Sequence, residues 1–274
     1  MSDKSPEYVL GTHDAELERL GFQARLWADA AHAAWKRAGL SPGWRALDVG
    51  CGPGFASFDM GQLVGGRGRV VGVDESPGFV AAAKAGARGR GLAQCGFVEG
   101  NAQRLRASVD GPFDLAYLRW VLCFVADPEA VVAEVAGLVR PGGRIVVHDY
   151  FNYTSMTCAP KRAAWPQVVE ATARSWRARG GDPDVMGRLP AMLERQGFSL
   201  DHLEVHQRHA RPHETMFHWA STWWRNYVPR LVEMGEISAG LGERFMADLA
   251  EIEADPWQFI VMPPVWEVVG TRGG

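Results

Sequence analysis

The nine residues 46–54, Ala-Leu-Asp-Val-Gly-Cys-Gly-Pro-Gly, restrict the fold more than any other part of this sequence. An apolar run over residues 44–49 leads into the three glycines, and apolar side chains recur at helical spacing over residues 55–64. Glycines adopt the positive φ angles of a tight turn and let a ligand approach the backbone. A strand, a glycine turn and a helix begin a doubly wound α/β sheet, where ligands bind beyond the carboxyl ends of the strands. The sequence therefore predicts this fold class and a ligand at the turn.

The spacing of the glycines and the acid before them indicate which ligand the turn accepts. Dinucleotide-binding turns read Gly-x-Gly-x-x-Gly. Here Gly50, Gly52 and Gly54 alternate, and Phe55 stands where the third glycine of that pattern belongs. Asp48, at the tip of the predicted strand, would repel a pyrophosphate and attract a cation. The turn therefore favours a ligand with an ammonium or sulfonium centre.

Residues 46–54 resemble motif I of the class I S-adenosylmethionine-dependent methyltransferases. The resemblance implies a Rossmann-like methyltransferase fold, which is an α/β, doubly wound, seven-stranded and mostly parallel sheet. It also implies that Asp48, Gly50, Gly52 and Gly54 bind S-adenosyl-L-methionine as cofactor. Further signatures follow in family order from residue 46 to about residue 149, and the ordered set is more specific than any single motif.

An acid follows the second predicted strand, residues 69–73. Asp74, with Glu75 after it, lies 24 residues beyond Gly50, close to the spacing of an acid that accepts hydrogen bonds from ribose hydroxyls. We therefore predict that Asp74 and Glu75 contact the cofactor. The alternative role of Asp74 is to cap the helix predicted near residues 77–90.

The loops after the third and fourth predicted strands, residues 95–99 and 113–117, also carry family signatures. Asn101 and Ala102 match the acid or amide and the small residue that meet the adenine in the family. The alternative for Asn101 is a solvated loop amide. Arg119 corresponds to a position whose backbone faces the methionyl end of the cofactor, and its side chain can pair with a carboxylate.

A fifth strand over residues 144–148 completes the family order. His148, Tyr150 and Tyr153 lie at or just beyond its carboxyl end, where the resemblance places the substrate beside the methyl group. His148 titrates in the range of a general base, and we predict all three as catalytic residues. The alternative for His148 is a satisfied strand histidine, with Asp149 capping a turn.

Residues 1–43 precede the sheet as an N-terminal helical segment. Apolar residues recur in it at helical spacing, which predicts a helix packed on the core. The resemblance offers a second interpretation, in which this segment covers the cofactor pocket and Tyr8, Arg19 and Gln23 close over the cofactor.

Residues 44–274 form the predicted methyltransferase domain, and its second half follows the family pattern less closely. Helical, substrate-determining insertions are predicted at about 151–196 and 212–254. The last two strands, at 198–209 and 257–269, are antiparallel to each other in this fold, and two prolines interrupt the second of them. The many tryptophans beyond residue 150 form either an aromatic lid over an apolar or aromatic substrate or ordinary core packing.

Charge and composition exclude several kinds of partner. The net charge of −3 gives no reason to expect nucleic acid. No apolar run approaches the roughly 20 residues of a membrane span, and residues 1–14 contain no apolar h-region of a secretory signal. The four cysteines form no Cys-x-x-Cys pair, which argues against a zinc site and a disulfide framework. We therefore expect a cytoplasmic monomer or homodimer.

Four histidines follow one another closely in the sixth predicted strand and after it. On a strand, His202 and His206 share a face with Glu204, while His209 points the other way. With His213, they match no zinc pattern. We therefore predict a solvated edge-strand face and no metal.

The leading function is transfer of a methyl group from S-adenosylmethionine to the O, N or C atom of a small molecule. A nucleic-acid methyltransferase is disfavoured, because Leu-Arg-Trp-Val stands where its Asn/Asp-Pro-Pro-aromatic motif would follow the fourth strand. Two alternatives come from other classes. One is a non-catalytic protein that binds S-adenosylmethionine or S-adenosylhomocysteine. The other is a nicotinamide-dependent oxidoreductase, which Asp48 and Phe55 disfavour.

Overall fold

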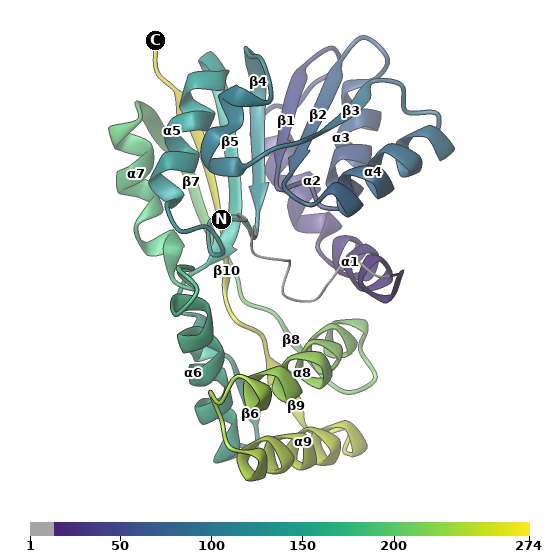
Figure 1. Ribbon diagram of the computed structural model, residues 1–274, viewed down its shortest axis with the longest axis vertical. Helices are drawn as coiled ribbons and strands as arrows, with labels where there is room; N and C mark the ends of the chain where they lie inside the picture. Colours follow the sequence, from purple (N-terminus) through teal and green to yellow (C-terminus); the bar gives the residue numbers. More distant parts are fainter. Residues whose placement is uncertain (1–13) are drawn as a thin grey trace, which may run out of the picture.

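The computed structural model describes residues 14–274, and its largest element is a seven-stranded sheet in the order β3-β2-β1-β4-β5-β10-β7 (Figure 1). Strands β1 to β5 pair in parallel, and β10 is antiparallel to both β5 and β7. The doubly wound, mostly parallel sheet is therefore confirmed, as is the antiparallel pairing of its last two strands. The strands are β1 (Arg45–Val49), β2 (Arg69–Asp74), β3 (Cys95–Glu99), β4 (Phe113–Arg119), β5 (Val139–Tyr150), β7 (Phe198–His206) and β10 (Val265–Arg272).

Helices cover both faces of this sheet, because side chains that alternate along each strand are apolar on both sides. On one face, Ala46, Leu115 and Val146 pack with Trp35 of α2 and Met60 of α3. Their neighbours along the strands belong to the core on the other face, with α5. The helices around the sheet are α2 (Ala28–Arg37), α3 (Phe55–Val64), α4 (Pro77–Gly89), α5 (Pro128–Leu138) and α7 (Leu189–Arg195).

A second, three-stranded sheet lies in the lower part of Figure 1, in the order β6-β9-β8, with three helices around it. Two predicted strands are divided between the two sheets. Residues 198–209 form β7 and then β8, and residues 257–269 form β9 and then the start of β10. Proline offers no backbone N–H to a ladder, so Pro263 and Pro264 separate β9 from β10. The elements of this part are β6 (Thr157–Ala159), α6 (Ala164–Arg177), β8 (His209–Ala210), α8 (Thr215–Glu233), α9 (Ala239–Ala254) and β9 (Phe259–Val261).

The N-terminal helical pattern forms two helices, α1 (Asp14–Leu26) and α2, which meet at Trp27. The indole of Trp27 is buried, and the Arg208 guanidinium lies 4.2 Å from its ring centroid. Arg208 also donates hydrogen bonds to the Leu26 carbonyl and to Asp29, each at 2.7 Å. The junction of α1 and α2 is thereby tied to the segment between β7 and β8.

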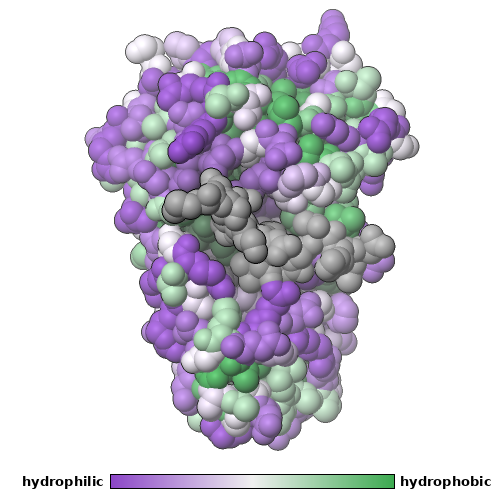
Figure 2. Space-filling model, in the orientation of Figure 1, coloured by the Kyte–Doolittle hydropathy of each residue, from purple (hydrophilic) through white to green (hydrophobic). Residues whose placement is uncertain are grey.

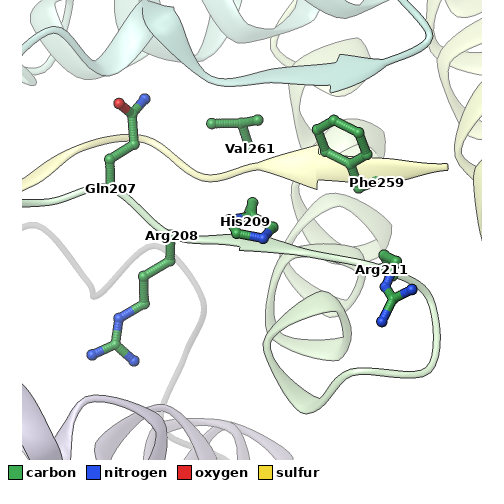
Figure 3. A pocket seen from close by; sticks show the side chains of 6 residues that line it. All are labelled: Gln207, Arg208, His209, Arg211, Phe259 and Val261. Carbon is green, nitrogen blue, oxygen red and sulfur yellow. The ribbon is translucent and has the colours of Figure 1, made fainter. Parts of the chain in front are cut away.

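Figure 2 shows hydrophilic residues over most of the visible face, with smaller hydrophobic areas between them. Within residues 14–274, no helix combines the length and the apolar character needed to cross a bilayer. A surface hollow of about 480 Å³ (Figure 3) lies beside β8 and β9, and none of the predicted site residues lines it; its lining is Gln207, Arg208, His209, Arg211, Phe259 and Val261.

Candidate functional site

The glycine turn after β1 combines close packing at two positions with open space at the third. Gly50, Gly52 and Gly54 all have positive φ, at 64°, 52° and 85°. A Cβ on Gly50 would lie 2.5 Å from Cγ2 of Val121, and one on Gly54 would lie 3.0 Å from Cβ of Ala83. A Cβ on Gly52 would meet nothing within 4 Å. Gly52 therefore offers bare backbone to a ligand, whereas the other two glycines serve the packing of the turn.

Asp74 joins this turn to the end of β2. Its Oδ2 accepts a hydrogen bond from the Gly52 N–H at 2.8 Å, and its Oδ1 accepts one from the Ser76 N–H at 2.9 Å. Burial raises the pKa of the carboxyl, and these two bonds oppose the rise. The alternative role of helix cap falls to Ser76, whose hydroxyl accepts the Phe79 N–H. Asp74 is thus an acid beside the turn, and the Glu75 side chain after it is exposed.

Asp48 lies under the turn, on the sheet face that α3 covers. Its side chain is buried, and its Oδ2 accepts a hydrogen bond of 2.5 Å from the Ser57 hydroxyl. Burial raises the pKa of this carboxyl to about 6, against the opposing effects of Ser57 and Arg119. Ser57 was not among the predicted residues, and only its place in the first turn of the following helix signals it in the sequence. The structure brings Asp48 together with Ser57 and leaves it enclosed.

The residues predicted to contact the adenine and the methionyl end of the cofactor lie at the ends of β3 and β4. Asn101 is exposed, and its Oδ1 accepts the Gln103 N–H at 2.8 Å, which caps the short 3-10 helix Ala102–Ala107. Arg119 ends β4, and its guanidinium lies 5.4 Å from the ring centroid of Trp120. The Asn101 carbonyl oxygen thus has a local partner, while Arg119 lies beside the aromatic residue that follows β4.

Aromatic side chains gather where β4 and β5 end, and we call Trp27, Trp120, Tyr150, Tyr153 and Trp219 the aromatic cluster. Trp120 stacks on Tyr150 and on Trp219 with centroids 6.0 and 6.1 Å apart, and Trp27 meets it edge-on at 5.4 Å. Tyr150 meets Tyr153 edge-on at 5.2 Å. Burial raises the pKa of both tyrosine hydroxyls well above the usual value. Both tyrosines are therefore protonated at neutral pH and contribute apolar rings to the cluster.

Trp120 has an unusual backbone for a residue of its size, with φ at 52°. Its N–H donates to the His148 carbonyl at 2.9 Å. Three residues further on, the Cys123 N–H donates to Oδ2 of Asp149, which is buried and also accepts the Tyr150 N–H. Asp149 therefore holds the loop after β4 to the end of β5, and this loop presses Val121 against Gly50. The sequence suggested a turn cap for Asp149 but gave no sign of this longer connection.

Two of the three N-terminal residues predicted to close over the cofactor, Arg19 and Gln23, lie on the described helix α1. Gln23 on α1 accepts hydrogen bonds from the Trp219 indole at 2.9 Å and from Arg19 at 3.2 Å. These bonds tie α1 to α8 and to the aromatic cluster. Tyr8 lies outside the described residues.

His148 contacts a different set of residues from the two tyrosines that were also predicted as catalytic. Its side chain is buried, and its Nε2 lies 3.2 Å from Oε2 of Glu267 on β10. Its ring lies against Tyr117 at 5.8 Å and His206 at 5.9 Å. Burial lowers its pKa, against the opposing effect of Glu267. The structure thus groups His148 with Glu267 and His206 rather than with the aromatic cluster.

Comparison with known proteins identifies the central part of the chain. A family model described as a methyltransferase domain matches residues 47–147. The ubiquinone/menaquinone biosynthesis C-methyltransferase UbiE of Shewanella oneidensis is 26% identical over 155 residues, which cover 54% of this chain and 61% of that protein. The chain spans about a third to three fifths of the length of the first curated relatives it matches.

Solved structures share the fold at low sequence identity. A methyltransferase from Bacillus halodurans superimposes with a TM-score of 0.60 at 18% identity, covering 89% of this chain and 99% of that one. The cyclase SpnF gives a TM-score of 0.55 at 20% identity, covering 89% and 80%. These two likenesses establish the architecture, and the family match establishes its type. Residues 47–147 of the chain are therefore a methyltransferase domain of the class I S-adenosylmethionine-dependent family.

Proposed function

We propose that the protein transfers a methyl group from S-adenosylmethionine to a small-molecule acceptor. The observation that carries the proposal is the open backbone at Gly52, held by Asp74. A side chain at this position would occupy the space that the ligand needs, and no atom of residues 14–274 fills that space. The sulfonium of the bound cofactor would supply the electrophilic methyl group, so the protein has mainly to align the acceptor and exclude water.

Each part of the proposed cofactor site has a physical role. The Gly52 backbone would contact the cofactor directly, and the exposed Glu75 and the remaining lone pairs of Asp74 would accept hydrogen bonds from ribose hydroxyls. Asn101 and Ala102 would lie beside the adenine, and Arg119 would pair with a carboxylate of the cofactor or of the acceptor. Asp48 would act from beneath the turn, as an enclosed negative charge near a cationic ligand.

The acceptor is proposed to be an apolar or aromatic small molecule. The aromatic cluster at the ends of β4 and β5 presents stacked rings, a surface that favours offset stacking with a planar ligand. The name of the Shewanella relative refers to C-methylation in ubiquinone and menaquinone biosynthesis, which makes quinone precursors the first acceptors to try. We also propose a cytoplasmic monomer or homodimer without a nucleic-acid partner.

A general base, if the acceptor needs one, is proposed at His148. Its Nδ1 is buried and has no hydrogen-bond partner among residues 14–274. A neutral imidazole with a free lone pair can accept a proton. For this role the acceptor would have to reach Nδ1, whereas Tyr150 and Tyr153 would contribute packing.

Matched glycine substitutions test the cofactor site. Gly52 and Gly91 have φ of 52° and 67°, and a Cβ on either meets nothing within 4 Å. Gly52→Ala and Gly91→Ala should therefore lower the free energy of unfolding by a similar amount, roughly 1–2 kcal/mol. Only Gly52→Ala should weaken S-adenosylhomocysteine binding in calorimetry, by about tenfold or more, which corresponds to ~1.4 kcal/mol.

The same titrations distinguish the competing functions. Binding of NAD in place of S-adenosylhomocysteine would contradict the proposal and favour an oxidoreductase. Equal affinity of both glycine variants would remove Gly52 from the site. Binding of S-adenosylhomocysteine without transfer of a labelled methyl group to a panel of quinones, phenols and amines would favour the non-catalytic alternative.

A further inference from the structure

Three adjacent strands place histidines around one buried carboxylate, away from the glycine turn. Glu267 on β10 is fully buried and pairs in register with His148 on β5 and with Glu204 on β7. Nε2 of His148 lies 3.2 Å from Oε2 of Glu267, and Nε2 of His206 lies 3.0 Å from the same oxygen. The three donor atoms come from β5, β7 and β10 and all lie within 4.8 Å of one another.

These distances suit a small tetrahedral metal ion. With bonds of about 2.0–2.1 Å to nitrogen and oxygen, the donor atoms around zinc lie roughly 3.3 Å apart. The two distances from Oε2 to the imidazole nitrogens are already close to that value. Small side-chain shifts would open a position that all three atoms coordinate.

The donor chemistry selects the class of metal. Two imidazole nitrogens and one carboxylate oxygen form a set that zinc takes with a fourth position left open. Mg²⁺ and Ca²⁺ prefer sites made of oxygen atoms. A divalent transition metal is therefore favoured over either of these ions.

The surroundings orient the carboxylate for this role. Arg37 on α2 pairs with Oε1 of Glu267 and, at 3.2 Å, with Glu204. Oε2 is left facing the two histidines. A partner that fixes the second oxygen of a ligating carboxylate is the usual outer-shell arrangement of protein metal sites.

We propose that His148, His206 and Glu267 bind Zn²⁺ and that the ion fastens the edge strand β7 to the sheet. Leu200, Leu203 and Val205 on β7 are 44–46% exposed, so these three side chains add little packing to the pairing of β7 with β10. His206 is partly exposed, with 18% of its side-chain surface accessible, so the ion can reach the site from solvent. The proposed metal site and the general base proposed at His148 exclude each other, because an imidazole that binds a metal through Nε2 carries its proton on Nδ1. The metal site also differs from the metal-free edge face expected from the sequence.

Metal titration of the tag-free, full-length protein tests this site. After treatment with a chelator and its removal, Co²⁺ should bind one per chain with the intense visible absorption of a tetrahedral complex. Zn²⁺ should displace it and raise the melting temperature, whereas Mg²⁺ should do neither. His206→Gln should weaken binding by about tenfold or more, by analogy with the loss of a supporting ligand.

Two further variants make the result decisive. His209→Gln removes an exposed histidine three residues from His206 and should leave Co²⁺ binding unchanged. Glu267→Gln should abolish binding, and circular dichroism checks that this variant folds. Absence of Co²⁺ and Zn²⁺ binding, or equal binding by His206→Gln, would overturn the proposal. Loss of binding only in His202→Gln would also overturn it, because the ligands would then be His202, Glu204 and Glu267.

Discussion

Single buried carboxyl groups make the free energy of unfolding of this protein depend on pH. Asp48 has a pKa of about 6 in the fold, above its ordinary value of 3.8, because burial disfavours the charged form. The folded chain therefore keeps a proton that the unfolded chain releases between these values. Raising the pH through this window favours unfolding, and the contribution of Asp48 to stability is largest below it.

Asp48→Asn should remove this pH dependence. From about pH 4 to pH 7, the wild-type protein should lose up to about 3 kcal/mol of unfolding free energy relative to the variant. Urea unfolding at both pH values measures the difference. Asp59→Asn on the neighbouring helix α3, where the side chain is 42% exposed, is the control variant. A constant difference between wild type and Asp48→Asn would contradict the burial argument.

The residues of the site differ in how far the sequence could identify them. The tight turn at Gly50, Gly52 and Gly54 could be predicted, because glycine itself permits the positive φ angles that all three adopt. The partners of His148 could not be predicted, because Glu267 lies 119 positions away and reaches it through sheet register. The same holds for Asp149, whose bond to the Cys123 backbone spans 26 positions. A motif can be predicted from residues that are neighbours in the sequence. The contacts of a strand residue depend on pairing with distant parts of the chain.

At the scale of elements, helix α4 begins at a cap that is separate from the cofactor site. Ser76 accepts the Phe79 N–H at 3.3 Å, while the carboxylate of Asp74 faces Gly52. Asp74 and Ser76, which lie two positions apart, therefore have different partners, and the helix cap that the sequence left open for Asp74 belongs to Ser76. One residue serves the start of the helix, and the other holds the turn.

Ser76→Ala should lower the free energy of unfolding by about 1 kcal/mol, since the cap hydrogen bond is lost. Its affinity for S-adenosylhomocysteine should stay close to that of the wild type, because the backbone bond to Asp74 remains. Chemical denaturation and calorimetry on the same preparation measure both quantities. A large loss of affinity without a loss of stability would mean that Ser76 belongs to the ligand site.

The strand divisions were harder to predict than the strands themselves. Residues 198–209 and 257–269 were each predicted as one strand, and each segment contains strand residues of both sheets. Alternation does not reveal which sheet a segment joins, because the pairing partners are distant in the chain. The prolines between β9 and β10 marked the break but not the change of sheet.

At the scale of the whole molecule, one hydrophobic core connects both sheets. Leu47 and Val147 of the main sheet belong to the same buried cluster as Trp165 on α6, Trp224 on α8 and Phe245 on α9. Trp219 and Trp27 add aromatic contacts between α8 and the α1–α2 junction. Opening one part would therefore expose apolar surface of the other.

The chain should consequently unfold in a single transition. Far-ultraviolet circular dichroism, which follows all helices, and tryptophan fluorescence should give the same urea midpoint and slope. Tryptophans in both parts make fluorescence sensitive to either one. Two separated midpoints would show that the smaller sheet and its helices unfold independently.

The order of synthesis matters for a chain that is built in this way. β10 is an inner strand of the large sheet, between β5 and β7, and β9 is the middle strand of the small one. Both come from residues 259–272. Until the ribosome has released this stretch, β5 and β6 each expose an unpaired edge. Insertion of this one segment therefore completes both sheets, and neither sheet has all of its strands before that step.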